Sequence, residues 1–265
     1  EAGKTYFNAK NFDYKSKEQM AFTTIVLLSD KRKVAGLQTF AGFGKSLTYI
    51  LPMMVLKKCS KIHYVNFICV PYKTMIVPII KKLKTGGLHV EEMLEFTSFV
   101  EDRFLSNIDV FVGCPDSFGD DKTIDIFKNW ESLYTPKNQL GYLVFEEAHH
   151  FSAGAQCEKS VGNIRDLSWE KWRKTLLLSA TMDRTMYHNM LEERKIPDAI
   201  IDTSLFIDSI YKVPEVNIEI DVERIENNEI ITEATRLICN FANHTSDVNA
   251  VFFFWVKRYV ASGLR

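Results

Sequence analysis

The chain has 265 residues, of which 46% are hydrophobic and 25% are charged, and its formal net charge is -1 at pH 7. This length and apolar content exclude a disordered chain and predict one complete domain plus part of another. The nearly balanced charge excludes a protein that holds nucleic acid by bulk positive charge alone, so any such contact must be local.

The spacing of the cysteines and the lengths of the apolar runs exclude further classes of protein. The five cysteines include no C-x-x-C pair, which favours reduced thiols over a zinc site or a disulfide framework. No apolar run approaches the roughly 18 residues that a membrane span requires, and no basic segment leads into an apolar one at the N-terminus. We therefore expect no membrane partner and an intracellular, nuclear location.

Short apolar runs alternate with amphipathic stretches from residue 34 onward, a pattern typical of βαβ units. The runs are nearly continuous, as in strands that are covered on both faces. The predicted strands are residues 34–39, 63–70, 109–113, 141–145, 175–179 and 199–202. The predicted helices are residues 45–58, 72–85, 123–134 and 184–195. This order predicts the α/β class, with a mainly parallel sheet and helices on both faces.

The helical pattern lapses around residues 197–214, and a new strand pattern begins at residue 216. We expect a first domain at residues 1–203, a connection at 204–215 and the beginning of a second domain at 216–265. Strands at 216–222 and 248–255 and a helix at 228–243 are predicted there. These elements are too few to close a second sheet.

Residues 39–46 (TFAGFGKS) lie between a predicted strand and a predicted helix and nearly match the pattern G-x-x-x-x-G-K-[ST]. Glycines let the backbone wrap tightly, so that N–H groups and the helix N-terminus point at phosphate oxygens. Lys45 is expected to pair with the β and γ phosphates of ATP, and Ser46 to offer its hydroxyl to Mg²⁺. Thr39 replaces the first glycine, and an ordinary glycine-rich turn is the alternative. The residues predicted to bind the nucleotide here are Ala41, Gly42, Phe43, Gly44, Lys45 and Ser46.

A P-loop needs one carboxylate to hold Mg²⁺ and another to activate water. Residues 143–149 (LVFEEAH) supply both at the end of an apolar run, where open α/β sheets place their ligands. Glu146 is the metal-side candidate and Glu147 the candidate general base. Exposed glutamates that cap a strand are the alternative. A further run ends in Ser179 and Thr181, whose hydroxyls are predicted to bond to the acidic loop and transmit the state of the γ-phosphate.

These residues resemble superfamily 2 helicases. The AGFGKS segment at 41–46 resembles motif I, the EEAH segment at 146–149 resembles a DEAH-type motif II, and the SAT segment at 179–181 resembles motif III. The resemblance implies a RecA-like P-loop domain, followed by the start of a second RecA-like domain. It also implies an ATP-dependent helicase or translocase that uses ATP and Mg²⁺.

The same resemblance extends to shorter motifs. Gln19 is placed like the glutamine that reads adenine in this superfamily, and His149 like a residue that couples motif II to motif III. Residues 70–73 (VPYK) resemble motif Ia, which implies nucleic-acid contacts from Pro71, Tyr72 and Lys73. Residues 113–116 are weakly similar to motif Ib. We expect a nucleic-acid partner, DNA in preference to RNA.

Two subfamilies share further segments with the chain. Residues 44–52 (GKSLTYILP) resemble the RecQ family, whereas residues 64–72 and 140–151 are more similar to helicases of the subtelomeric Y-prime elements of yeasts. Two features depart from the superfamily. Glu146 replaces the metal-side aspartate, and one additional methylene can displace a carboxylate enough to lower the rate on the order of 100-fold. Motifs V and VI, with the arginine finger, do not appear by residue 265, so this fragment alone is expected to hydrolyse ATP poorly.

Several residues have two interpretations. Lys81, Lys82 and Lys84 could lie beside a phosphate backbone or on a solvated helix face. The tryptophans at 130, 169 and 172 are predicted to serve the core rather than stack on bases. Adjacent His149 and His150 have no matching ligand pair for a metal. Besides a motor, the sequence leaves open a degenerate domain that binds without turnover, and a small-molecule ATPase or kinase.

Overall fold

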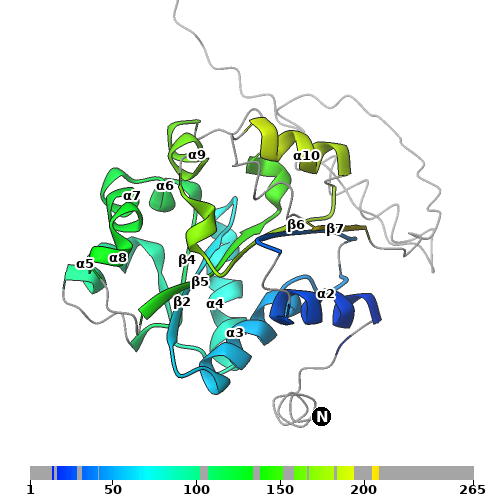
Figure 1. Cartoon of the computed structure of the whole chain (residues 1–265), viewed down its shortest axis with the longest axis horizontal. Helices are drawn as coiled ribbons and strands as arrows, with labels where there is room; N and C mark the ends of the chain where they lie inside the picture. The colour runs from blue at the N-terminus through cyan, green and yellow to red at the C-terminus, as the bar shows by residue number, and fades with distance from the viewer. Residues whose placement is uncertain are drawn as a thin grey trace, which may run out of the picture. The chain divides into compact units, whose positions relative to one another are not determined.

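The computed structural model describes residues 14, 17–28, 32–40, 42–101, 107–133, 138–151, 158–165, 167–181, 184–193 and 205–208. These contain a seven-stranded sheet in the order β3-β4-β2-β5-β6-β1-β7, in which every pair of neighbouring strands is parallel (Figure 1). The strands are β1 (Val34–Gln38), β2 (His63–Cys69), β3 (Val90–Glu92), β4 (Val110–Gly113), β5 (Asn138–Glu146), β6 (Lys174–Ser179) and β7 (Leu205–Asp208).

One face of the sheet packs against three helices, α2 (Lys17–Leu28), α3 (Leu47–Cys59) and α4 (Ile76–Thr85). The opposite face is covered by α5 (Phe96–Glu101), α6 (Pro115–Phe118), α7 (Asp121–Lys128), α8 (Trp130–Leu133), α9 (Glu158–Arg165) and α10 (Arg184–Glu193). Short 3₁₀ turns join them: η1 (Lys73–Met75), η2 (Met93–Glu95), η4 (Ala148–Phe151) and η5 (Trp169–Lys171). The predicted α/β class, with helices on both faces of a parallel sheet, is confirmed.

The core of the second face is aromatic. Phe67 on β2 lies at its centre, with six aromatic rings whose centroids are 5.0 to 6.4 Å away, at Phe96, Phe111, Phe118, Phe127, Trp130 and Trp172. Edge-to-face contacts dominate, which is the favoured arrangement for aromatic quadrupoles. Trp130, Trp169 and Trp172 are all buried. The prediction that these tryptophans serve the core is therefore confirmed.

Several predicted boundaries change. The helix predicted at 45–58 begins at Leu47, and the one predicted at 123–134 divides into α7 and α8 at Asn129. The helix α2 and the three-residue strand β3 were not predicted. The segment 205–208, which the sequence placed in the connection between domains, forms β7 and pairs with β1.

The chain separates into two compact units, residues 1–213 and 214–265. All described residues belong to the first unit. The strand predicted at 199–202 and the predicted second RecA-like domain at 216–265 lie outside the described residues. None of the described helices has the length and apolarity that a membrane span requires.

Candidate functional site

The loop predicted to hold phosphates connects β1 to α3. Gly42 and Gly44 have φ angles of 90° and 89°, a region that residues with a β-carbon rarely enter. Among the described residues, no protein acceptor takes a hydrogen bond from the N–H groups of Gly44, Lys45 or Ser46. These donors at the start of a helix fit phosphate oxygens. Ala41 lies outside the described residues.

The acidic half of the candidate site begins where β5 ends at Glu146. Glu147 follows with a φ of 49° and is the only non-glycine residue with a positive φ in the described part of the chain. Its Oε1 atom lies 3.3 Å from Nζ of Lys45. The lysine and glutamate side chains are 11% and 26% exposed. This ion pair brings the loop and the acidic edge into one site.

Glu146 is buried, with only 5% of its surface exposed. Burial raises the pKa of Glu146 above its ordinary value, because a charged carboxylate loses its water. Burial also raises the pKa of Tyr49 on α3, and the nearby charge of Glu146 raises it further. None of the described residues makes a hydrogen bond of standard geometry to the Tyr49 hydroxyl, which is itself fully buried. Sequence reasoning missed Tyr49, although its position three residues after Ser46 places both on one side of α3.

Ser46 and Glu146 are the two side chains that could bind a metal ion at this site. The Ser46 side chain makes no capping hydrogen bond at the start of α3, and its contact with Tyr49 partly offsets the rise in the pKa of Tyr49. Within the described residues, no group of three or more His, Cys, Asp and Glu side chains is arranged to hold a metal. A metal at Ser46 and Glu146 must therefore take further ligands from phosphates and water, as Mg²⁺ does in nucleotide sites.

His149 connects the acidic edge to β6. Its Nδ1 atom lies 2.7 Å from Oγ of Ser179 and 3.6 Å from Oε2 of Glu147. Burial lowers the pKa of His149, and the charge of neighbouring His150 lowers it further. The expected contact between the acidic loop and Ser179 is thus present. Thr181 takes no side-chain part in it, because its side chain is exposed and only its N–H donates, to Ser179 Oγ at 3.2 Å.

Gln19 on α2 is buried against the phosphate loop. Its Nε2 atom donates to the carbonyl oxygens of Phe43 at 3.1 Å and Gly44 at 2.9 Å. These bonds attach α2 to the loop: they supply a donor to the Phe43 carbonyl and a second donor to the Gly44 carbonyl, which also accepts from the Leu47 N–H at 2.9 Å. A contact between Gln19 and adenine stays a prediction.

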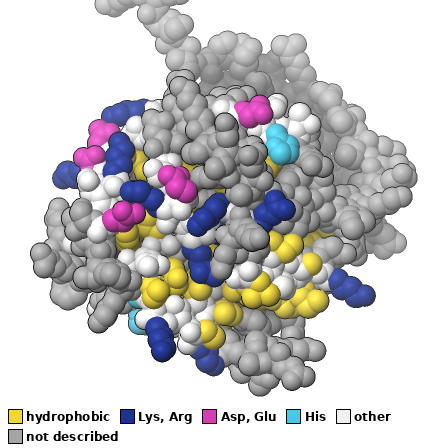
Figure 2. Space-filling model, in the orientation of Figure 1, with side chains coloured by type: hydrophobic (Ala, Val, Ile, Leu, Met, Phe, Trp, Pro, Cys, Tyr) yellow, Lys and Arg dark blue, Asp and Glu magenta, His cyan; other side chains and the backbone are white. Residues whose placement is uncertain are grey.

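The residues predicted to contact nucleic acid lie just after the carboxyl end of β2. Tyr72 is 51% exposed, and Lys73 beside it begins the 3₁₀ turn before α4. The Tyr72 hydroxyl reaches Nε2 of His150 at 3.3 Å, and the two rings meet edge to face. In the face shown by Figure 2, Lys and Arg side chains are scattered among acidic and hydrophobic ones.

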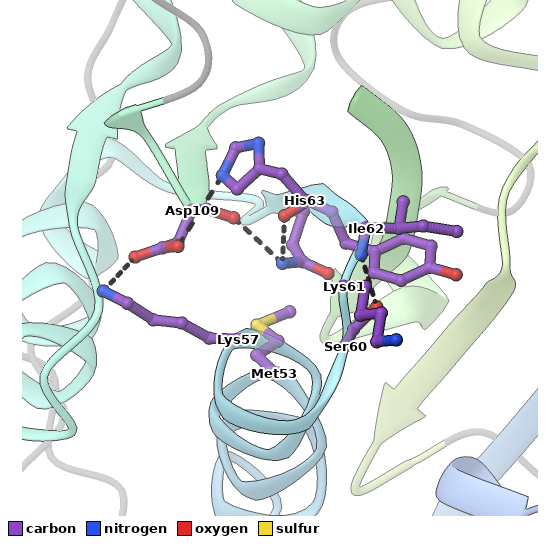
Figure 3. A pocket seen from close by; sticks show the side chains of 9 residues that line it. Met53, Lys57, Ser60, Lys61, Ile62, His63 and Asp109 are labelled. Atoms are coloured by element: carbon purple, nitrogen blue, oxygen red, sulfur yellow. Dashed lines mark hydrogen bonds and ion pairs between the residues drawn. The ribbon is translucent and has the colours of Figure 1, made fainter. Parts of the chain in front are cut away.

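A pocket of about 180 Å³ opens at the amino edge of the same sheet, between the end of α3 and the starts of β2 and β4 (Figure 3). Asp109 contributes a buried carboxylate to this pocket. Lys57 Nζ lies 2.7 Å from Oδ2 of Asp109, the His89 N–H donates to the same oxygen at 2.7 Å, and His63 Nε2 lies 3.8 Å from Oδ1. The carboxylate is thus held by the protein itself, which favours a structural role for this pocket.

Comparisons with known proteins identify the family and the fold. The sequence model of DEAD/DEAH box helicases matches residues 16–188. A Y' element ATP-dependent helicase of Saccharomyces cerevisiae is 26% identical over 186 residues, which cover 68% of this chain and 10% of that protein. An uncharacterized helicase-like protein of the same yeast is also 26% identical, over 27% of its length. The chain thus spans between about a tenth and a quarter of these two relatives.

Solved structures of two helicases share the fold. The DEAD-box helicase Mss116 bound to ssRNA and UDP-BeF has a TM-score of 0.54 at 18% identity, over 78% of this chain and 42% of that one. Dbp5 of S. cerevisiae bound to RNA and ADP BeF3 has a TM-score of 0.54 at 16% identity, over 77% and 48%. At these identities the likeness concerns the RecA-like fold alone. With the family match covering most of the chain, these findings show that the chain belongs to the DEAD/DEAH box helicase family.

Proposed function

We propose that this chain is the ATP-binding part of a nucleic-acid motor, a helicase or translocase that binds ATP with Mg²⁺ and contacts a nucleic-acid backbone. The observation that carries the proposal is the 3.3 Å ion pair between Lys45 of the glycine loop and Glu147 after β5. It connects the two parts that a phosphoryl-transfer site needs, a phosphate cradle and a general base.

The side chains have separate roles in this proposal. Phosphate oxygens would replace Glu147 as the partner of Lys45, and the released carboxylate would orient and deprotonate the attacking water. Ser46 and Glu146 would hold Mg²⁺, which neutralises charge on the phosphates when it is bound. His149 would keep the acidic loop attached to Ser179 on β6.

The nucleic-acid strand is proposed to run past the end of β2, at Pro71, Tyr72 and Lys73. Tyr72 and Lys73 are exposed and Pro71 is half-buried, and the contact of Tyr72 with His150 lies next to the acidic loop, which supports this position. Backbone contacts by a lysine give affinity that depends on salt but not on sequence. We propose DNA as the strand, in a protein that is longer than this chain, as the relatives are.

Binding of a fluorescent ATP analogue with Mg²⁺ tests the nucleotide site. Lys45→Ala should weaken the affinity of the chain by roughly 10- to 150-fold, since a hydrogen bond to a charged group contributes about 1.5–3 kcal/mol. Lys122→Ala, at an exposed position on α7, is the matched control and should bind like the unmodified chain. Equal affinity in the Lys45 variant and the control would contradict the proposal.

A degenerate domain that binds without efficient turnover is the second candidate. It is favoured by Glu146, a longer side chain than the family's aspartate, whose burial raises its pKa and so opposes the charged form that Mg²⁺ needs. Glu146→Asp in a protein that carries both motor domains decides between the two. A large gain in ATP hydrolysis supports the degenerate domain, whereas efficient hydrolysis before the substitution rules it out.

A further inference from the structure

A contact between Tyr72 and His150 joins the segment after β2 to the turn that follows the acidic edge. The Tyr72 hydroxyl and Nε2 of His150 are 3.3 Å apart, and the ring centroids are 5.1 Å apart at an interplanar angle of 73°. Tyr72 is still 51% exposed, so its hydroxyl is engaged while much of its surface faces solvent. An exposed aromatic face can stack on a base of any sequence.

The contact continues inward to the phosphate loop. The rings of His150 and His149 lie 4.1 Å apart at 38°, and Nδ1 of His149 lies 3.6 Å from Oε2 of Glu147. The other oxygen of Glu147 pairs with Lys45. Four consecutive contacts thus lead from the surface at Tyr72 to the lysine of the glycine loop. Sequence reasoning considered His150 only as a metal ligand and set it aside.

Coupling between two sites needs an element with two arrangements that both sites can bias. The segment from Glu147 through η4 is the candidate for such an element, because it contains the left-handed backbone of Glu147. Glu147 adopts a left-handed φ of 49°, a conformation that is unfavourable for a residue with a β-carbon. Its carbonyl accepts a hydrogen bond from the N–H of His150 at 3.0 Å. A change at His150 therefore acts on the backbone of Glu147 as well as on its side chain.

We propose that Tyr72 and His150 are positioning residues through which a single nucleic-acid strand, bound at the end of β2, regulates the nucleotide site. A base stacked on Tyr72 holds its hydroxyl against His150, and the stacked histidines then place Glu147 and its partner Lys45. This inference rests on the proposed function, since it needs both a nucleotide and a strand. It goes further by naming the contact that couples them.

The test measures the coupling as a ratio of affinities in the 265-residue chain. A fluorescent ATP analogue with Mg²⁺ is titrated without and with a saturating amount of oligothymidylate, and separately of oligouridylate. Because the oligonucleotide is saturating, a variant that binds the strand more weakly is still fully occupied by it. The ratio then measures only the coupling between strand and nucleotide. The strand should raise the nucleotide affinity by at least about fivefold, the lower range of typical allosteric coupling. The oligonucleotide with the larger ratio identifies DNA or RNA as the regulating strand.

Tyr72→Phe removes only the hydroxyl and keeps the ring, and His150→Ala removes its partner. Each should bring the ratio close to one, and the double variant should bring it no lower than either single one, because both remove the same contact. Tyr64→Phe, at the opposite edge of the sheet, is the matched control and should keep the ratio of the unmodified chain.

The outcomes separate this inference from the proposed function. A ratio that both variants leave unchanged overturns the inference, as does a ratio of one in the unmodified chain. The proposed function survives these results if Lys45→Ala still weakens nucleotide binding. An unmodified chain that binds neither the nucleotide nor the strand overturns the proposed function, and the inference with it.

Discussion

Each of the two edges of the sheet carries a lysine, a carboxylate and a histidine, but the carboxylates differ in burial and in their hydrogen bonds. At the carboxyl edge, Lys45 lies 3.3 Å from Glu147, and His149 lies 3.6 Å from it. At the amino edge, the Lys57 ion pair with Asp109 is 2.7 Å long, and His63 lies 3.8 Å from that carboxylate. A lysine, a carboxylate and a histidine therefore do not by themselves mark a functional site.

The difference lies in how the protein holds each carboxylate. Asp109 has an 8% exposed side chain and takes an additional hydrogen bond from the backbone of His89. Glu147 has a 26% exposed side chain on a backbone in the left-handed region. The first arrangement stabilises the fold, whereas the second keeps a charged group accessible at the expense of local strain.

The largest expected effect is on hydrolysis. Glu147→Gln, in a protein that carries both motor domains, should lower the rate of ATP hydrolysis by roughly 100-fold or more, because an amide cannot act as a general base. Its free energy of unfolding should change by less than about 1 kcal/mol, as for partly exposed ion pairs. Steady-state turnover and chemical denaturation measure the two quantities. Hydrolysis at the unmodified rate would exclude Glu147 as the base.

At the amino edge, we expect a substitution to change the stability of the fold and to leave nucleotide binding unchanged. Asp109→Asn should lower the free energy of unfolding by about 2 kcal/mol, since it removes the charge that holds Lys57 and the His89 N–H. Asp125→Asn, at an exposed position on α7, is the control and should stay within about 0.5 kcal/mol of the unmodified chain. A loss of nucleotide binding in folded Asp109→Asn protein would show that the two edges are not independent.

The pH dependence of this stabilisation has a defined sign. Burial raises the pKa of Asp109, but the nearby His63 ring and hydrogen bonds from Lys57 and the His89 backbone lower it more, so the net pKa lies below the ordinary value of 3.8. A folded-state pKa below the unfolded one gives stability that is present above the unfolded pKa and lost as pH falls through the folded pKa. The difference in unfolding free energy between Asp109→Asn and the unmodified chain should persist at neutral pH and shrink below about pH 4. If the difference in unfolding free energy instead grew as the pH fell, the pKa of Asp109 would have to be raised in the folded state, which would contradict this prediction.

The smallest effect concerns the backbone of Glu147. Glu147→Gly and Glu147→Ala both remove the carboxylate, but only alanine keeps a β-carbon in the left-handed region. The glycine variant should therefore be more stable than the alanine variant by about 1 kcal/mol. Thermal unfolding of the glycine and alanine variants measures the free-energy cost of a β-carbon at this position. Equal stabilities would show that the turn relaxes when the side chain is removed.

Much of the fold was predictable from local pattern. Five of the predicted strands are present because buried parallel strands need nearly continuous apolar runs. The helix α2 escaped prediction because KEQMAFTTIVLL is apolar around most of its circumference and contains several β-branched residues. The strands β3 and β7 are only three and four residues long, and their pairing partners on β4 and β1 lie elsewhere in the sequence. Short edge strands of this kind have no periodicity to detect.

The sequence by itself determined the family and placed the glycine loop before a helix and the two glutamates at a strand end, because glycine requirements, helix starts and strand ends are local properties of the chain. Only the tertiary structure decided that Lys45 pairs with Glu147, that Gln19 holds the loop, and that Tyr72 contacts His150. These contacts join residues far apart in the chain, and their geometry depends on how helices and strands pack around a common core. Packing, and not periodicity, selects which of many polar residues at a sheet edge meet.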